Sequence, residues 1–420
     1  MMTAREIVPL HRNRDFVLLW TGHWISFLGS RMSAVCYPLL ALWISGGSAA
    51  AAGVATAAAI APSVVFQLPA GALVDRWDRR RVMAVCAGCR ALALGAVAAA
   101  LLTGTLSLTV LLGAVFVDTS LAIFSGLAER VTVRQVVPAA QLGSAMGQNE
   151  ARGRVAGLIG APLGTLLFTW TRWSPFLLAA AGTLVAFANV SLMRADTRPA
   201  PATGDRHVGR EMLDGFTWLR DHAFLRAAVT LVSLSGVFFQ LVSLALMVVL
   251  VQEQGHPESA IGLLFGISGC GGVAGAVTAR WWLNRLPLPA VVIGGFAAWG
   301  ALMAASAFVV SPVGLGALFA AMSFVGAVFN VASAVYQMTA TPAELQGRVG
   351  GAAGFAAAAA AGLGAIGAGY LLEATSGATG LLVAAAGMAA VTVAAFVTPA
   401  IRRTRLPEPE PAPGDLVTTT

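Results

Sequence analysis

The chain is built from long apolar runs that are separated by short polar segments. A helix rises about 1.5 Å per residue, so about 20 apolar residues cross the hydrocarbon core of a bilayer. Runs of this kind extend over Phe16 to Ile44, Ala49 to Val74, Val82 to Leu102, Leu106 to Ala128, Leu142 to Phe168, Pro175 to Met193, Phe224 to Val251, Ala260 to Leu283, Ala290 to Val310, Val313 to Met338, Val349 to Leu372 and Ala378 to Ala400. They predict an all-α membrane protein with about twelve transmembrane helices.

The composition favours a membrane protein and argues against a nucleic-acid partner. Hydrophobic residues make up 57% of the chain and charged residues 11%, whereas soluble domains carry about 25% charge. The net charge of +7 would suggest nucleic acid in a soluble protein, but no basic face interleaves with aromatic residues. The lipid bilayer is therefore the expected surrounding.

Arginine residues gather in every second loop. The basic loops contain Arg12 and Arg14; Arg76, Arg79, Arg80 and Arg81; Arg130 and Arg134; Arg194, Arg198, Arg206, Arg210 and Arg220; Arg280 and Arg285; Arg348; and Arg402, Arg403 and Arg405. The intervening loops near Gly46, Gly104, Gly255, Ser311 and Gly377 carry none, and Arg172 is the exception. By the positive-inside rule, we expect a multi-pass protein of the inner (plasma) membrane with both termini in the cytoplasm.

A weak internal repeat predicts two six-helix halves. The segment Val137 to Gly143 leads into the fifth span, and the similar segment Thr341 to Gly347, about 204 residues later, leads into the eleventh. We expect one half over residues 1–193, a linker over 194–222 with a cytoplasmic amphipathic helix, a second half over 223–400, and a disordered tail over 401–420.

A charged island from Gly71 to Arg81 joins the second and third spans. Gly71 would let a neighbouring helix approach closely, and Asp75 would cap a helix or pair with an arginine across a helix interface. The basic cluster holds this loop on the cytoplasmic side: Arg76, Arg79, Arg80 and Arg81.

This island closely resembles the loop between the second and third helices of major facilitator superfamily transporters, which reads roughly G-x-L-x-D-R-x-x-R-R. The resemblance covers nearly the whole chain and is nearest to the bacterial branch of macrolide-efflux and enterobactin-exporter-like proteins. The opening Asn13 to Phe16 with Trp20, and the run from Glu211 to Arg226, resemble that branch too. The resemblance implies alternating access between two halves, with the loop around Asp75 acting as a cytoplasmic gate.

The fifth span is similar to the glycine and proline signature of proton-driven drug antiporters, through Gly157, Gly160, Pro162 and Gly164. Proline bends a helix and glycines allow close packing, so an ordinary close-packed interface is the alternative interpretation. The chain departs from the branch in the first span, where an acid often follows the central glycine: it reads Gly29-Ser30-Arg31, a basic residue with no acid beside it.

Charged residues inside spans are expensive and are therefore functional candidates. Asp118 lies near mid-depth in the fourth span and Glu150 in the fifth, where Arg152 and Arg154 follow it. With Arg31, we expect these residues to form a buried polar cluster that handles protons at a central cavity. In the alternative, Asp118 and Glu150 are permanently neutralised by Arg31, Arg152 or Arg154 and only hold helices together.

The second half offers neutral polar groups for the cavity wall, namely Gln240, Asn330 and Tyr336. The four cysteines fall in apolar segments, and Cys86-x-x-Cys89 lacks the second pair that a metal site needs. We therefore expect no cofactor, no metal and no enzymatic activity.

These features predict a monomeric secondary active exporter of amphipathic small molecules, such as a drug, antibiotic, siderophore or other natural product, driven by proton antiport. An importer or a transporter without proton coupling, including one for lipid-like substrates, is the alternative. A membrane receptor that does not transport is a remote third possibility.

The arginine pattern makes a topological prediction. In a cysteine-free background, Arg12→Cys and Arg403→Cys should react with an impermeant thiol reagent only after the membrane is opened, because both termini are cytoplasmic. Cysteines placed next to Gly104 and Gly255 should react on intact cells. Termini on opposite sides of the membrane would contradict an even number of spans.

Overall fold

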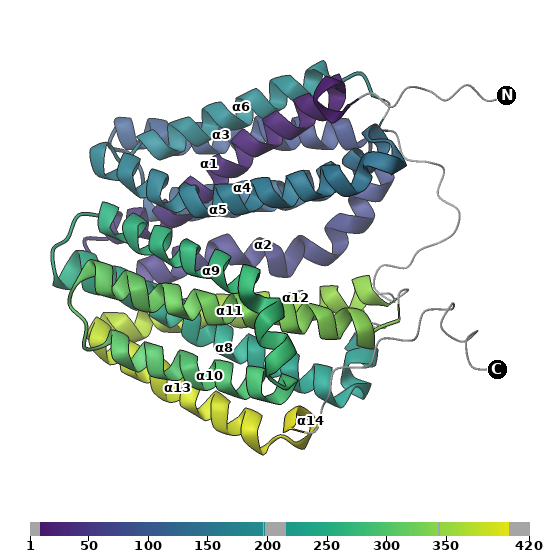
Figure 1. Cartoon of the computed structure of the whole chain (residues 1–420). Helices are drawn as coiled ribbons and strands as arrows, with labels where there is room; N and C mark the ends of the chain where they lie inside the picture. The colour runs from purple at the N-terminus through teal and green to yellow at the C-terminus, as the bar shows by residue number, and fades with distance from the viewer. Residues whose placement is uncertain (1–8, 196, 198–215, 343–344, 403–420) are drawn as a thin grey trace, which may run out of the picture.

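The computed structural model describes residues 9–195, 197, 216–342 and 345–402, and the regular structure in them is helical. The long helices are α1 (Arg14–Ile44), α2 (Ala49–Arg76), α3 (Arg79–Leu102), α4 (Leu108–Val136), α5 (Leu142–Trp170), α6 (Ser174–Leu192), α8 (Ala223–Met247), α9 (Ser259–Arg285), α10 (Leu288–Ser306), α11 (Pro312–Ala340), α12 (Gln346–Ala374) and α13 (Gly377–Val397). A short helix, α14 (Pro399–Arg402), follows them, and a π-helical turn, η3 (Val248–Glu253), extends α8. The predicted twelve-helix architecture is confirmed (Figure 1).

Eleven of the described helices are long and apolar enough to cross a membrane. The twelfth, α5, has 29 residues, but its first half carries Glu150, Arg152 and Arg154. The helix α4 is longer than predicted, because it continues beyond the predicted end at Ala128 to Val136. The span therefore includes Glu129, a charged residue that the apolar pattern left outside it.

Serine caps and glycine turns set the ends of several helices on one side of the molecule. The side chains of Ser48, Ser107 and Ser311 accept a backbone N–H from the first turns of α2, α4 and α11. Gly104 and Gly255 follow the ends of α3 and η3. Their φ values of 69° and 67° lie in the left-handed region, which favours glycine. We call this side the far end, and the side with the arginine-rich loops the basic end.

The helices form two six-helix halves, α1–α6 and α8–α13, which lie one above the other in Figure 1, with the start of α1 and the short helix α14 toward the same end. Pairs of glycines let helices of the two halves touch. A Cβ atom built on Gly53 of α2 would lie 2.8 Å from the Cα of Gly369 of α12. A Cβ atom on Gly262 of α9 would lie 2.9 Å from the Cα of Pro162 of α5. Both contacts lie toward the far end.

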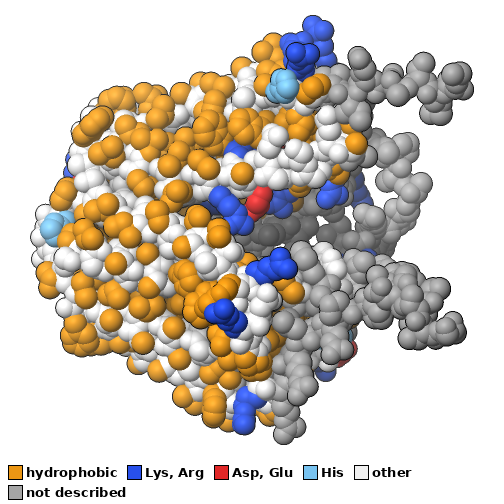
Figure 2. Space-filling view, viewed as in Figure 1, with side chains coloured by type: hydrophobic (Ala, Val, Ile, Leu, Met, Phe, Trp, Pro, Cys, Tyr) orange, Lys and Arg blue, Asp and Glu red, His pale blue; other side chains and the backbone are white. Residues whose placement is uncertain are grey.

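Polar contacts also join the halves at the far end. A carboxylate oxygen of Glu373 on α12 accepts the Ser48 hydroxyl and the Ala50 backbone N–H, each at 3.0 Å, and so caps α2. The Gln252 side chain donates to the Gly47 carbonyl at 2.6 Å. At the basic end a hollow opens between the halves, and the visible surface is otherwise largely apolar (Figure 2). The halves are thus clasped at the far end.

Part of the expected linker is described. Residues 216–221 are helical, Leu219 is buried, and the Phe216 ring meets the Phe355 ring edge-on with centroids 5.9 Å apart. Residues 198–215 of the linker and 403–420 of the tail lie outside the described residues. The expectations of an amphipathic helix and a disordered tail stay predictions.

The glycine contact at the far end generates a prediction. Gly369→Ala should lower the thermal midpoint of the purified protein, because the new Cβ would lie 2.8 Å from the carbonyl oxygen of Ala49 and overpacking costs about 1–3 kcal/mol. The matched control is Gly367→Ala on the same helix, where a Cβ meets nothing within 4 Å and should be tolerated. Equal midpoints for the two variants would contradict this packing.

Candidate functional site

A central cavity lies between the halves and takes residues from α1, α2, α5, α8, α9 and α12. Its volume is about 530 Å³, within the range of roughly 300–1,000 Å³ that is typical of small-molecule sites. Arg31, Thr56, Gln240 and Ser243 supply its polar groups. A second cavity of about 500 Å³ shares Gly157 with it and contains residues of α5, α8, α9, α10 and α11.

Of the predicted cavity wall, Gln240 lines the first cavity and Asn330 the second. Tyr336 lies on neither of these two linings. Its ring packs on Phe224, with centroids 4.1 Å apart. The structure therefore places Tyr336 in the packing between α8 and α11.

Arg31 projects from α1 into the first cavity and is exposed there. Its guanidinium lies 4.9 Å from the centre of the Phe27 ring, a cation–π contact. A Cβ atom on Gly160 would overlap the Cβ of Arg31, and a Cβ on Gly164 would lie 2.6 Å from the Met32 carbonyl oxygen. These glycines of α5 thus let α1 pack closely at Arg31 and Met32.

The predicted signature in α5 divides between two roles. Gly160 and Gly164 permit the close approach of α1, whereas Gly157 borders both cavities and has no atom near its Cβ position. Pro162 packs against α9, where a Cβ on Gly266 would lie 3.1 Å from the proline ring. The expectation of close packing therefore holds for two of the three glycines.

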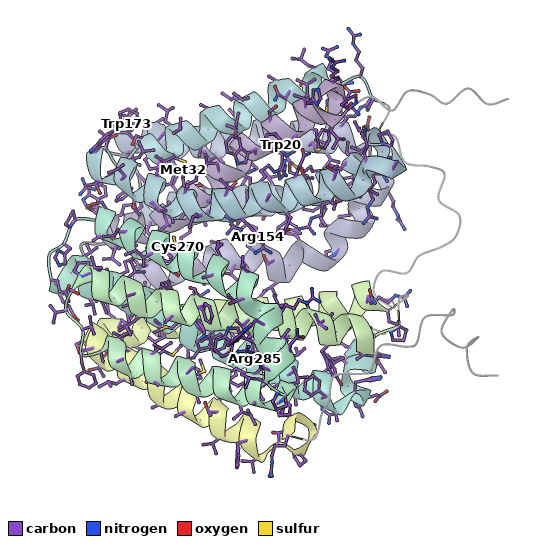
Figure 3. The ribbon with its side chains drawn as sticks, in the orientation of Figure 1. Trp20, Met32, Arg154, Trp173, Cys270 and Arg285 are labelled. Carbon is purple, nitrogen blue, oxygen red and sulfur yellow. The ribbon has the colours of Figure 1, made fainter. Side chains whose placement is uncertain are left out.

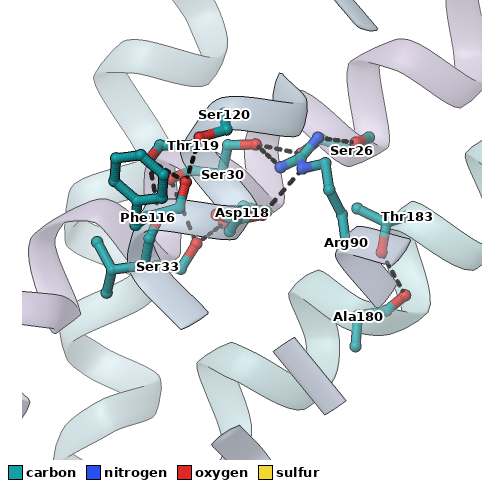
Figure 4. A network of polar contacts seen from close by, with 12 residues as sticks. Ser26, Ser30, Ser33, Arg90, Phe116, Asp118, Thr119, Ser120, Ala180 and Thr183 are labelled. Atoms are coloured by element: carbon teal, nitrogen blue, oxygen red, sulfur yellow. Dashed lines mark hydrogen bonds and ion pairs between the residues drawn. The ribbon is translucent and has the colours of Figure 1, made fainter. Parts of the chain in front are cut away.

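Asp118 on α4 is buried in a polar network within the first half (Figure 4). One carboxylate oxygen accepts Nε of Arg90 at 2.9 Å, and the other accepts the Tyr37 hydroxyl at 2.8 Å. The remaining nitrogens of Arg90 donate to Ser26 at 3.1 Å and to Ser30 at 2.6 Å. The partner of Asp118 is therefore Arg90 of α3, and not Arg31, Arg152 or Arg154 as expected.

A second buried carboxylate is Glu129, nearer the basic end of α4. It accepts Nη2 of Arg152 at 2.7 Å, and its other oxygen lies 3.1 Å from Nε2 of His23. Arg152 also donates to the Trp20 carbonyl at 3.1 Å. The side chain of His23 is 20% exposed, so one ionisable member of this network is partly accessible.

Glu150 does not belong to a buried cluster, which corrects the expectation. Its side chain is 71% exposed and pairs with Arg154, one turn further along α5, at 3.1 Å. Arg154 lines the second cavity and lies between the two halves in Figure 3. Successive residues of a helix are about 100° apart, so Arg152 lies on the other side of α5 and is buried against α4.

The sequence analysis missed Arg90 and Glu129. Arg90 stands alone in the middle of the third apolar run. A lone charge at membrane depth is the sequence signal that could have identified it. Glu129 falls one residue beyond the predicted end of the fourth span. Extending that span to the observed end of α4 at Val136, about two turns further on, would have included it.

The loop between α2 and α3 is tied to the end of α6 within the first half. Arg79 donates to the Thr197 carbonyl at 3.3 Å, and Arg80 donates to the carbonyls of Val190 and Ser191, which end α6. Arg76 is exposed, and no atom lies within 4 Å of a Cβ built on Gly71. The expected close helix contact at Gly71 is therefore absent.

Asp78 caps α3 in this loop. Partial burial alone would raise the pKa of Asp78, but hydrogen bonds from the Thr197 hydroxyl at 2.9 Å and the Arg80 N–H at 3.0 Å hold it below its ordinary value. The side chain of Asp75 lies outside the described part of the chain. Its place in the last turn of α2 is all that can be stated of it.

The four cysteines are free thiols, and none belongs to the described lining of either cavity. Cys86 is buried and Cys89 is exposed on α3, and both are free thiols. No group of three His, Cys, Asp or Glu side chains with metal-binding geometry occurs among the described residues.

The sequence from residue 19 to residue 365 matches the family described as Major Facilitator Superfamily. No curated protein matches the sequence. Solved structures of transporters are similar in fold. A variant of the nucleoside transporter NupG has a TM-score of 0.76 at 14% identity, covering 91% of this chain and 99% of that chain.

Two further structures are a bacterial homologue of the human lysosomal transporter Spinster, inward-facing and unoccupied, and a bacterial homologue of the iron transporter ferroportin, also inward-facing. The first has a TM-score of 0.69 at 13% identity and covers 93% of this chain and 96% of that chain. The second has a TM-score of 0.68 at 16% identity and covers 92% of this chain and 98% of that chain. At these identities the likeness concerns the fold alone. The family match over most of the chain, together with two six-helix halves around a central cavity, shows that this multi-pass membrane protein belongs to the major facilitator superfamily of transporters.

Proposed function

We propose that the protein is a proton-driven exporter of amphipathic small molecules that works by alternating access. The observation that carries this proposal is a pair of buried carboxylate networks, at Asp118 and Glu129, inside the half that also contributes Arg31 to the central cavity. Ionisable groups at membrane depth are costly, and in transporters they mark proton and substrate pathways. The cavity itself is mostly apolar, which suits an amphipathic substrate.

The contacts between the halves at the far end and the hollow at the basic end support a state of the alternating-access cycle that is closed at the far end and open at the basic end. If the basic end faces the cytoplasm of a cell whose inner (plasma) membrane holds the protein, this state takes substrate from inside. The division into halves at residues 1–193 and 223–400, a monomeric state and membership of the macrolide-efflux and enterobactin-exporter-like branch belong to this proposal. Protons and a small-molecule substrate are its partners.

Glu129 is the better candidate for proton exchange. Its network contains His23, whose ordinary pKa lies in the physiological range and whose side chain is partly exposed. When His23 takes up a proton it becomes a cation, and Glu129 then has two cationic partners, His23 and Arg152. When His23 releases the proton, Arg152 is the remaining cationic partner. Asp118, by contrast, has its oxygens occupied by Arg90 and Tyr37 in a buried network and suits a fixed structural pair.

The coupling assignment is tested with Glu129→Gln and Asp118→Asn. Glu129→Gln leaves Arg152 without its counter-charge, so the assay also uses the double variant Glu129→Gln/Arg152→Gln, which removes both charges of the buried pair. We expect the folded fraction of either variant to bind substrate but to lose pH-gradient-driven efflux in proteoliposomes, because glutamine cannot exchange a proton. We expect Asp118→Asn to lose folded protein, since a buried Arg90 without its counter-charge costs about 3–5 kcal/mol. Compounds for the assay are chosen by comparing the drug susceptibility of cells that express the protein with that of cells that do not.

Glu150→Gln is the matched control, because it removes an exposed acid from an i,i+4 pair on α5. It should keep both folding and coupling. If Glu129→Gln still exchanges protons for substrate, the coupling residue is assigned wrongly. If efflux by the unmodified protein ignores the pH gradient, the proton-driven part of the proposal fails and the uncoupled alternative stands.

A second prediction concerns the gate at the basic end. Asp75→Asn should impair transport with near-normal membrane insertion, because charge-assisted hydrogen bonds of about 1.5–3 kcal/mol each would hold the halves together in the other state. Their loss shifts the populations of the two states without unfolding helices. Asp78→Asn is the control, since asparagine also caps helices and Asp78 bonds within the first half. Full transport by the Asp75→Asn variant would refute the gating role.

A further inference from the structure

We propose that the central cavity selects amphipathic anions, and that Arg31 binds the acidic group of the substrate. The inference rests on the proposed transport function and narrows its substrate class. It follows from the distribution of charge around the cavity, from the unpaired state of Arg31, and from the close packing of α1 on α5 that fixes its position.

The carboxylates that the described structure buries are turned away from the cavity. Asp118 is paired with Arg90, and Glu129 is paired with Arg152 and His23. Among the described residues, no acidic side chain belongs to the lining of either cavity. The first cavity therefore carries an arginine with no carboxylate on its described walls, an arrangement that repels cations and attracts anions.

The two arginines of the walls differ in one decisive respect. Arg154 already has a counter-charge, since Glu150 lies 3.1 Å from it. Arg31 makes no ion pair with any carboxylate in the described part of the chain, and its contact is with the Phe27 ring. A guanidinium without a counter-charge is costly at this depth, and an oxyanion such as a carboxylate, phosphate or sulfonate supplies its missing partner.

Close contact between α1 and α5 fixes the backbone from which Arg31 projects. A Cβ on Gly160 would overlap the Cβ of Arg31, and a Cβ on Gly164 would lie 2.6 Å from the Met32 carbonyl oxygen, so these two glycines let α1 approach α5. Arg31 itself lines the cavity between the halves.

The remaining lining suits the rest of such a molecule. Phe265, Leu244 and Met247 form an apolar wall on the second half, and Gln240 and Ser243 add hydrogen-bonding groups on α8. An acidic group at Arg31 would thus place an apolar body against the second half. The substrate bridges the two halves, which is what a transported molecule must do for its binding to change their relative populations.

The test uses three dyes that share a dansyl group and a hydrocarbon chain: 11-(dansylamino)undecanoate, its methyl ester, and dansyl cadaverine, which are an anion, a neutral molecule and a cation. Binding is measured by fluorescence on the full chain in nanodiscs of zwitterionic lipid. We expect the anion to bind at least about tenfold more tightly than the other two, the factor supplied by one charge-assisted hydrogen bond.

Three variants locate the effect. Arg31→Gln should weaken binding of the anion by about tenfold or more and leave the ester within about twofold, while Arg31→Lys should keep part of the preference. Gly160→Ala should weaken the anion too, because it displaces Arg31 without removing its charge. Arg285→Gln is the matched control, since Arg285 also packs on an aromatic ring, 3.9 Å from Trp281, but at the basic end of α9 (Figure 3).

Equal binding of the three dyes, no binding of the anion, or an unchanged anion affinity in Arg31→Gln would overturn the inference. Discs that contain an anionic lipid distinguish the source of the ligand: competition with the dye identifies a lipid as an occupant, and its absence favours a soluble acid. The assay needs no pH gradient. Anion selectivity without gradient-driven efflux would therefore contradict the proposed proton coupling but not this inference. Gradient-driven efflux of cations only would contradict this inference but not the proposed coupling.

Discussion

The buried pair of Arg90 and Asp118 is the interaction on which the first half depends. Arg90 comes from α3 and Asp118 from α4, and the same guanidinium reaches Ser26 and Ser30 on α1 (Figure 4). Neither charge could stay in a lipid-surrounded bundle alone, because an unpaired buried charge costs several kcal/mol. Three helices are consequently held at one depth and one rotation. That placement of α1 turns Arg31 toward the cavity.

The same rule explains the second network and the division of labour between the halves. Glu129 and Arg152 neutralise each other close to the basic end, and His23 gives this pair a partly exposed contact. The second half holds no comparable buried carboxylate among its described residues and offers a mostly apolar wall to the cavity. Charge chemistry is thus concentrated in one half. The other half supplies surface on which an apolar body can slide or pack.

Small residues decide where the halves meet. In a membrane there is little hydrophobic drive between helices, so close backbone approach and a few hydrogen bonds decide which surfaces associate. Gly53, Gly369 and Gly262 provide the approach, and Glu373 adds a cap across the interface by accepting from the start of α2. A clasp of this kind is local to the far end, so it can be released without rebuilding either half.

The sequence by itself determined the number and order of the spans, the two halves and the family, because a helix in lipid must be apolar over a length that the bilayer sets. It also indicated Asp118 and Arg31 as costly charges in spans. Only the tertiary structure decided which charges meet. Glu150 and Arg152 are two residues apart, yet the rotation of α5 exposes the first and buries the second against Glu129. Pairing depends on the rotation and depth of packed helices, and these follow from contacts between distant segments that an apolar pattern does not encode.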